Sequence, residues 1–134
     1  MRVQEETSTF FSQDKQYVLD YLKSRNLRNR TLVKIIRDYP FGLLEDASFF
    51  VGEEEYTITH FLSKSDIDGY DIRKVNALLK TESTDTIVFA LVLGDDALCY
   101  DIKSKEVFIW RIQTADGERL FVSDDLTKFL NSIE

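Results

Sequence analysis

The stretch TIVFALVLGDDALCYDIKSKEVFIWRI, residues 86–112, has the pattern of three β-strands joined by two tight turns. Apolar runs rich in β-branched and aromatic residues, separated by Gly, Asp and Ser clusters, are typical of hairpins. The runs are residues 87–93, 97–102 and 107–110, and the turns are 94–96 and 103–105. The first run lacks polar alternation, which favours a central strand covered on both faces, although periodicity alone does not exclude a buried helix segment.

Upstream of this stretch, Pro40 and Gly42 mark a break in the pattern. Before the break, apolar residues at helical spacing predict a helix that begins near Ser12 and a second helix over about residues 31–38, started by Thr31. After the break, the pattern predicts strands over 49–51 and 55–62, a helix over 70–80 and a short strand over 119–122. In the strand over 55–62, strict alternation would place His60 on one face with Tyr56, Ile58 and Leu62.

The C-terminal helix has the clearest signal. Ser123 is predicted as its N-cap, and the apolar stripe that follows consists of Leu126, Phe129, Leu130 and Ile133. The resulting order is ααββαβββ(β)α, and strands joined by tight turns pair antiparallel. We therefore expect an α+β fold, with helices packed on an antiparallel sheet of five to six strands. One domain spans residues 1–134, with a helical N-terminal part over 1–44 and the sheet and last helix over 48–134.

Charge is unevenly distributed along the 134 residues, whose formal net charge is −7. Residues 1–44 contain eight Lys or Arg and five Asp or Glu, whereas residues 45–134 contain nine and nineteen. Such an acidic surface keeps a protein in solution, repels phosphate backbones and could attract a basic partner. No apolar run approaches a membrane span, and the single cysteine, Cys99, fits a reducing compartment. We predict a cytoplasmic protein that binds neither nucleic acid nor membranes.

Candidates for catalysis are few. His60 is the only histidine and lies in an apolar strand pattern, as does Cys99, so both are expected to be packed core residues. Asp95 and Asp96 at a turn would suit a magnesium ion, but Gly and Asp are also the usual residues of a hairpin turn. We predict no catalytic residue, no metal and no cofactor. The least favoured alternative is a metal-dependent hydrolase that uses Asp95, Asp96 and Asp101.

A basic cluster lies in the helical part of the chain and consists of Lys23, Arg25, Arg28, Arg30, Lys34 and Arg37. A nucleic-acid patch is conceivable, but no aromatic residue is interleaved in this stretch to stack on bases. We favour a structural role, including ion pairs with the acidic remainder of the chain.

The C-terminal part of the chain resembles the SUKH superfamily, the group that includes the Smi/Knr-type proteins. The resemblance runs from about residue 48 to the end. It rests on an apolar strand, a Gly-Asp turn, a strand that closes on Tyr-Asp, a strand that ends in Trp, and a final helix. These features are Ile87–Leu93, Gly94-Asp95-Asp96, Cys99-Tyr100-Asp101, Val107–Trp110, and Ser123 through Phe129-Leu130.

The resemblance implies a non-enzymatic binding protein. Many bacterial members are immunity proteins that neutralise polymorphic toxins, often nucleases, and some eukaryotic relatives are regulatory or scaffold interaction modules. A nuclease needs a basic site, so an acidic surface would associate with it rapidly. On charge and turn position, the predicted partner-binding residues are Glu53, Glu54, Glu55, Asp95, Asp96, Asp116 and Glu118. Tyr100 is added as an exposed aromatic residue that could serve as a hot spot. We expect a basic toxin domain as partner, and a monomer or weak homodimer that pairs through the 48–62 hairpin edge.

Overall fold

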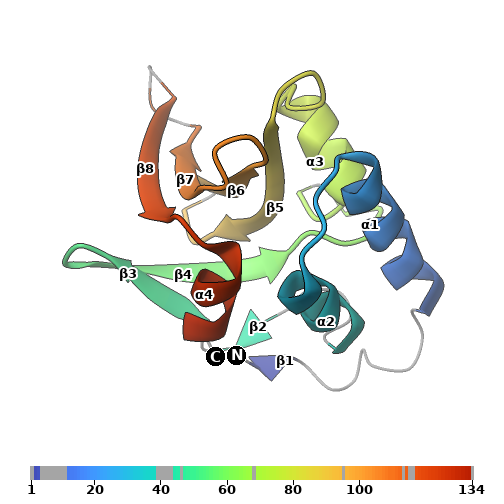
Figure 1. The fold of residues 1–134 in the computed structure, drawn as a ribbon, viewed down its shortest axis with the longest axis horizontal. Coiled ribbons are helices and arrows are strands. Elements are labelled where there is room, and N and C mark those ends of the chain that lie inside the picture. Colours follow the sequence, from blue (N-terminus) through green and yellow to red (C-terminus); the bar gives the residue numbers. More distant parts are fainter. Residues whose placement is uncertain are drawn as a thin grey trace.

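The structure of the chain is a computed structural model (Figure 1). It describes residues 2–3, 12–38, 44–45, 47–67, 69–94, 96–112, 114 and 117–133. The helices are α1 (Ser12–Ser24), α2 (Arg30–Asp38), α3 (Ile72–Leu78) and α4 (Leu126–Ser132). The strands are β1 (Arg2–Val3), β2 (Leu44–Glu45), β3 (Ser48–Val51), β4 (Glu54–Phe61), β5 (Thr86–Val92), β6 (Asp96–Asp101), β7 (Val107–Arg111) and β8 (Glu118–Ser123).

The main sheet is a six-stranded antiparallel meander in the order β3-β4-β5-β6-β7-β8. Each strand pairs with its neighbour in sequence, and α3 is inserted between β4 and β5. This confirms the expected α+β class and the element order. The short β1–β2 pair was not expected from the sequence, because strands of two residues carry no periodic signal.

The sheet curls until its two edge strands, β3 and β8, come near each other, so that the architecture is nearly a barrel. Helix α4 follows β8 directly and packs beside both edges (Figure 1). Its Phe129 meets Phe49 of β3 edge to face, with ring centroids 5.0 Å apart. The C-terminal helix therefore covers the seam where the sheet does not close.

Helices α1 and α2 form an adjacent pair, and α2 contacts α4 (Figure 1). Leu22 of α1, Leu27 of the α1–α2 connection, and Leu32 and Ile35 of α2 are buried in the same core as the apolar face of α4. The side-chain amide of Asn29 donates to the Thr127 hydroxyl at 3.0 Å and ties the start of α2 to α4. The helical N-terminal part is thus an integral layer of the single core.

Helix α3 meets the edge of β5 where β4 has ended. The Asn76 amide donates to the Val88 carbonyl at 3.0 Å and accepts from the Val88 N–H at 2.9 Å. A single buried side chain therefore takes the place of a neighbouring strand. Asp71 caps α3 by accepting from the N–H groups of Arg73 and Lys74.

Three local expectations were wrong. Helix α4 is capped by Asp125, because Ser123 still belongs to β8. Helix α2 starts at Arg30 rather than Thr31, since the Asn29 side chain accepts from the Leu32 N–H. In β4, a bulge between Ile58 and His60 breaks the alternation, so that Phe61 is buried as well.

Candidate functional site

The meander brings three sequence-distant turns to one end of the sheet. In an antiparallel meander alternate turns lie at the same end, so the β3–β4, β5–β6 and β7–β8 turns share one end of the sheet. We call this the acidic end, defined by the described carboxylates Glu53, Glu54, Glu55, Asp96 and Glu118. All five are among the partner-binding residues predicted from the sequence.

Arg111 lies among these carboxylates. It pairs in register with Glu118, and it lies one residue beyond Trp110, which pairs with Ala97. Its guanidinium is 3.9 Å from the Asp96 carboxylate and 3.6 Å from the Glu118 carboxylate. Arg119, which pairs in register with Trp110, is a second cation near this end, so the five carboxylates exceed the described cations by three charges.

Tyr56 connects the β3–β4 turn to the same group. Its hydroxyl donates to the Glu54 carboxylate at 2.9 Å. This hydrogen bond, together with burial and the charge of Glu54, raises the pKa of Tyr56, while the charge of Arg111 acts in the opposite direction. The neutral phenol therefore persists as a donor that orients Glu54.

Exposed apolar side chains accompany the carboxylates. Phe50 is 64% exposed and pairs with Glu55, and Leu93 is 72% exposed and donates its N–H to the Thr57 carbonyl. Paired residues point to one face of a sheet, so Phe50, Glu55, Thr57 and Leu93 share the outer face of β3–β4–β5. Sequence reasoning did not identify these two apolar residues. Phe50 could have been identified, because adjacent residues of a strand point to opposite faces, so a buried Phe49 places Phe50 on the outer face.

Of the other predicted partner-binding residues, Tyr100 does not join the acidic end. Tyr100 lies near the opposite end of β6 and is half-buried, and burial, followed by the charges of Asp101 and Asp125, raises its pKa. Asp95 and Asp116 lie outside the described residues.

Two of the residues considered for metal-dependent chemistry, Asp96 and Asp101, are far apart. Asp96 begins β6 and Asp101 ends it, which separates them by roughly 17 Å of extended chain. Asp101 instead accepts from the N–H groups of Lys103 and Ser104 in the next turn. Within the described ranges, no three His, Cys, Asp or Glu side chains gather as a metal-ligand set.

His60 and Cys99 occupy core positions, as expected. Cys99 is fully buried in β6, and burial raises the pKa of its thiol. The His60 ring stacks on Tyr70 with centroids 4.0 Å apart, and its Nε2 lies 2.8 Å from the Gly69 carbonyl. Burial lowers the pKa of His60, and the Gly69 hydrogen bond opposes part of that effect.

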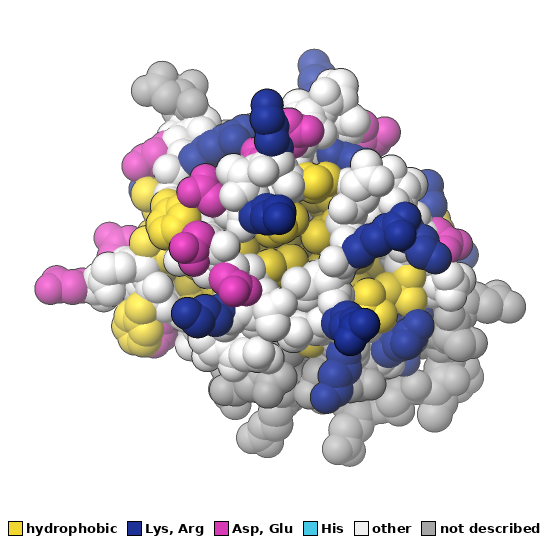
Figure 2. Space-filling model, in the orientation of Figure 1, with side chains coloured by type: hydrophobic (Ala, Val, Ile, Leu, Met, Phe, Trp, Pro, Cys, Tyr) yellow, Lys and Arg dark blue, Asp and Glu magenta, His cyan; other side chains and the backbone are white. Residues whose placement is uncertain are grey.

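The basic cluster divides into two parts. Arg25 is structural, because its guanidinium donates to the carbonyls of Thr81, Thr84 and Thr86 and to the Tyr21 hydroxyl. The other members line a groove of about 720 Å³ between α1 and α2, which we call the α1–α2 groove. Figure 2 shows it as apolar side chains framed by dark-blue ones over these two helices. The cations that line it are Lys23, Arg28, Arg30, Lys34 and Arg37.

Comparison of the chain with family models, curated proteins and solved structures finds no match. No helix in the described part of the chain is long and apolar enough to span a membrane.

Proposed function

We propose that this chain is a non-enzymatic binding protein of the SUKH type, and most concretely an immunity protein that neutralises a bacterial polymorphic toxin. The toxin would present a basic surface, as a nuclease does. The observation that carries the proposal is the gathering of Glu53, Glu54, Glu55, Asp96 and Glu118 at one end of the sheet.

Electrostatics supplies the mechanism. A site that holds phosphates must be basic, and a rigid acidic surface is attracted to it before any contact forms. The bound protein would then occupy the space that the nucleic acid needs. The carboxylates of Glu53 and Glu55 are exposed and make no ion pair with any residue that the structure describes, so they are available to cations of a partner.

Phe50 and Leu93 would supply the apolar part of the interface. Binding energy in protein interfaces concentrates in a few buried apolar anchors surrounded by polar contacts. Both side chains are more than half exposed, and they flank Thr57 on the outer face of the sheet. A partner that covers them would gain hydrophobic stabilisation in addition to charge attraction.

The proposal includes a cytoplasmic location, where an immunity protein meets a toxin that has entered the cell. The buried, unpaired thiol of Cys99 is consistent with a reducing compartment.

The first test is rescue. Co-expression of the chain with the toxic protein encoded beside it should restore growth, and the purified pair should form a complex. If growth is not restored and the chain instead forms a complex with another class of protein, that result would support the alternative, a regulatory or scaffold module.

The second test locates the interface. The double variant Glu53→Lys with Glu55→Lys should slow association with the toxin by about tenfold or more and flatten its salt dependence. The matched control is Glu82→Lys with Glu106→Lys, which makes the same change in net charge at exposed sites away from the acidic end. Equal effects of the two pairs would assign the attraction to net charge alone and remove the acidic end from the proposal.

A further inference from the structure

The lining residues of the α1–α2 groove recur at helical spacing on both of its walls. On α1, the lining residues Gln16, Leu19, Asp20 and Lys23 follow the i, i+3, i+4, i+7 spacing of one helix face. On α2, the lining residues Arg30, Val33, Lys34 and Arg37 repeat that spacing. Each wall is about 10 Å long, which matches two turns of a helix lying in the groove.

Aliphatic side chains form the floor. Leu22 and Leu27 are only 3% and 5% exposed, and Leu19 and Val33 are half-buried beside them. The apolar surface is therefore recessed between the helices and is reached by a side chain that enters the groove.

Cations dominate the rim. The described ion pairs involve other residues, so Lys23, Arg28, Arg30 and Lys34 have no carboxylate partner among the residues the structure covers. Among the described lining residues, Asp20 is the one carboxylate, and it accepts from the Gln16 amide at 2.7 Å. In a protein of net charge −7, ion pairs among the described residues do not account for this local excess of positive charge.

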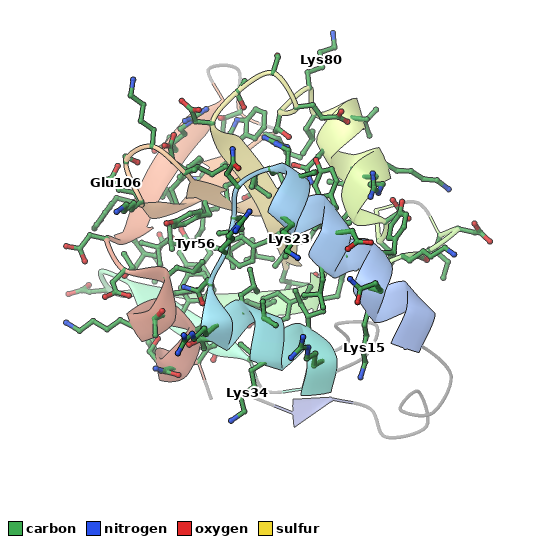
Figure 3. The ribbon with its side chains drawn as sticks, turned by 45° about the vertical axis from the view of Figure 1, so that its right-hand side comes forward. Lys15, Lys23, Lys34, Tyr56, Lys80 and Glu106 are labelled. Atoms are coloured by element: carbon green, nitrogen blue, oxygen red, sulfur yellow. The ribbon has the colours of Figure 1, made fainter. Side chains whose placement is uncertain are left out.

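A hydrogen bond links the two helices that form the groove. The Lys15 ammonium donates to the Arg37 carbonyl and joins the first turns of α1 to the end of α2. Figure 3 shows Lys15 on α1 reaching toward α2, Lys23 on α1, and Lys34 extending from α2 into solvent. The two helices are thus tied together through Lys15, while the cations at the rim stay exposed.

We propose that the α1–α2 groove binds an acidic amphipathic helix of a partner protein. Leucine-like side chains of that helix would enter between Leu19 and Val33, and its Asp and Glu residues would meet the cations of the rim. This is the helix-in-groove mode of recognition, in which apolar anchors at i, i+3, i+4 and i+7 fill a groove and flanking charges set specificity. The inference is independent of the toxin proposal, because it concerns a different surface of opposite charge.

Other occupants fit the groove less well. Single-stranded nucleic acid would use aromatic platforms, and none of the lining residues that the structure describes is aromatic. A membrane surface is bound by apolar side chains that protrude, whereas Leu22 and Leu27 are recessed. A second copy inserting its acidic end would make a head-to-tail contact rather than a two-fold dimer, between molecules that repel each other through their net charge.

Fluorescence anisotropy of the full chain with a labelled synthetic helix tests the proposal. The probe carries leucine at i, i+3, i+4 and i+7 and glutamate on its flanks, and a second probe has lysine in place of each glutamate. We expect the glutamate probe to bind and the lysine probe to bind at least about tenfold more weakly. Arg30→Glu with Lys34→Glu should weaken binding of the glutamate probe by at least about tenfold.

Controls separate the groove from general charge effects. Lys103→Glu with Lys105→Glu makes the same charge change at exposed residues of the β6–β7 turn and should leave the dissociation constant within about threefold. Leu19→Ser tests the floor without a change in charge and should weaken binding several-fold. Circular dichroism and thermal melting confirm that each variant is folded.

Four results would overturn the proposal. The first two are equal binding of the two probes, and binding of the glutamate probe that the groove variants leave unchanged. The third is groove-dependent binding of a single-stranded oligonucleotide or of phosphatidylglycerol vesicles that is tighter than binding of the glutamate probe. The fourth is concentration-dependent self-association that both Arg30→Glu and Glu55→Lys abolish.

Discussion

At the scale of single residues, His60 shows how burial removes a titratable group from chemistry. Its side chain is 5% exposed, stacked on Tyr70, and within hydrogen-bond distance of the Gly69 carbonyl. A carbonyl oxygen only accepts, so Nε2 carries the proton and the neutral ring has its free lone pair on Nδ1. The residue positions the β4–α3 loop and is neutral over a wider pH range than a free histidine.

His60 makes stability dependent on pH in a defined direction. Its pKa in the fold lies below the ordinary value of 6.5, so the unfolded chain binds a proton more readily in that window. The free energy of unfolding should therefore decline as pH falls from about 6.5 through the lowered pKa. Because the chain has one histidine, its ring resonances in an NMR titration report this pKa without ambiguity. His60→Gln, which keeps a donor toward Gly69, should remove the decline, and an unchanged decline would assign it to other groups.

Asn76 is the residue whose loss should cost most. It is fully buried, and besides its two hydrogen bonds to Val88 it donates to the Ile72 carbonyl at 2.8 Å and accepts from the Thr81 hydroxyl at 2.6 Å. Asn76→Ala would leave the Val88 N–H and carbonyl buried without these partners, which should lower the free energy of unfolding by about 2–4 kcal/mol. Urea denaturation measures the loss, and the exposed Asn131→Ala in α4 is the control, expected within about 0.5 kcal/mol of the parent. A cost for Asn76→Ala no larger than for Asn131→Ala would contradict this account of the β5 edge.

At the scale of elements, the start of α4 controls the helix that covers the sheet seam. Asp125 has extended backbone angles, and its carboxylate accepts from the Lys128 N–H at 3.0 Å. Asp125→Ala removes the cap and should destabilise the protein by about 1 kcal/mol. Asp124→Ala, at the exposed neighbouring position, should cost less than about 0.5 kcal/mol. Chemical denaturation of the two variants distinguishes the capping residue, and the reverse order of effects would place the cap at Asp124.

The long periodic elements could be predicted from the sequence, and their boundaries could not. The apolar runs of β5, β6 and β7 and the stripe of α4 carry strong signals because burial selects the residue at every position. The cap of α4 was misassigned because Ser123 and Asp125 are both good caps, and the choice depends on where β8 ends. The bulge in β4 and the role of Asn76 arise from tertiary contacts, which leave no local pattern.

The candidate surfaces were partly accessible from the sequence. Carboxylates in turns are visible in the chain, and the meander explains why alternate turns meet. The register of the strands is needed to predict which side chains lie near Arg111 and Tyr56, namely Glu54, Asp96 and Glu118. Predicting the α1–α2 groove would require the angle between the two helices. The pattern of a single helix does not show whether its face contacts the neighbouring helix or leaves a groove.

At the scale of the whole molecule, the two proposed surfaces differ in charge and are formed by different elements. The cations of the α1–α2 groove belong to the helical layer, and the acidic end belongs to the turns of the sheet (Figures 1 and 2). No residue contributes to both surfaces. The two proposals together imply that a basic and an acidic partner would bind at separate surfaces.

This separation predicts near-independent binding. At about 0.15 M salt, charges on different surfaces are screened beyond about 8 Å, so saturating the acidic end with the basic partner should change the dissociation constant of the acidic helix probe by less than about threefold. Lower salt should tighten probe binding to the complex relative to the free protein, because the partner neutralises carboxylates that repel the probe at long range. Anisotropy titrations of the probe, with and without the partner at several salt concentrations, measure both effects. A change in the probe's dissociation constant above about tenfold at 0.15 M salt would contradict independent binding. Coupling of that size is larger than residual charge attraction and would require that the two surfaces are coupled through the core.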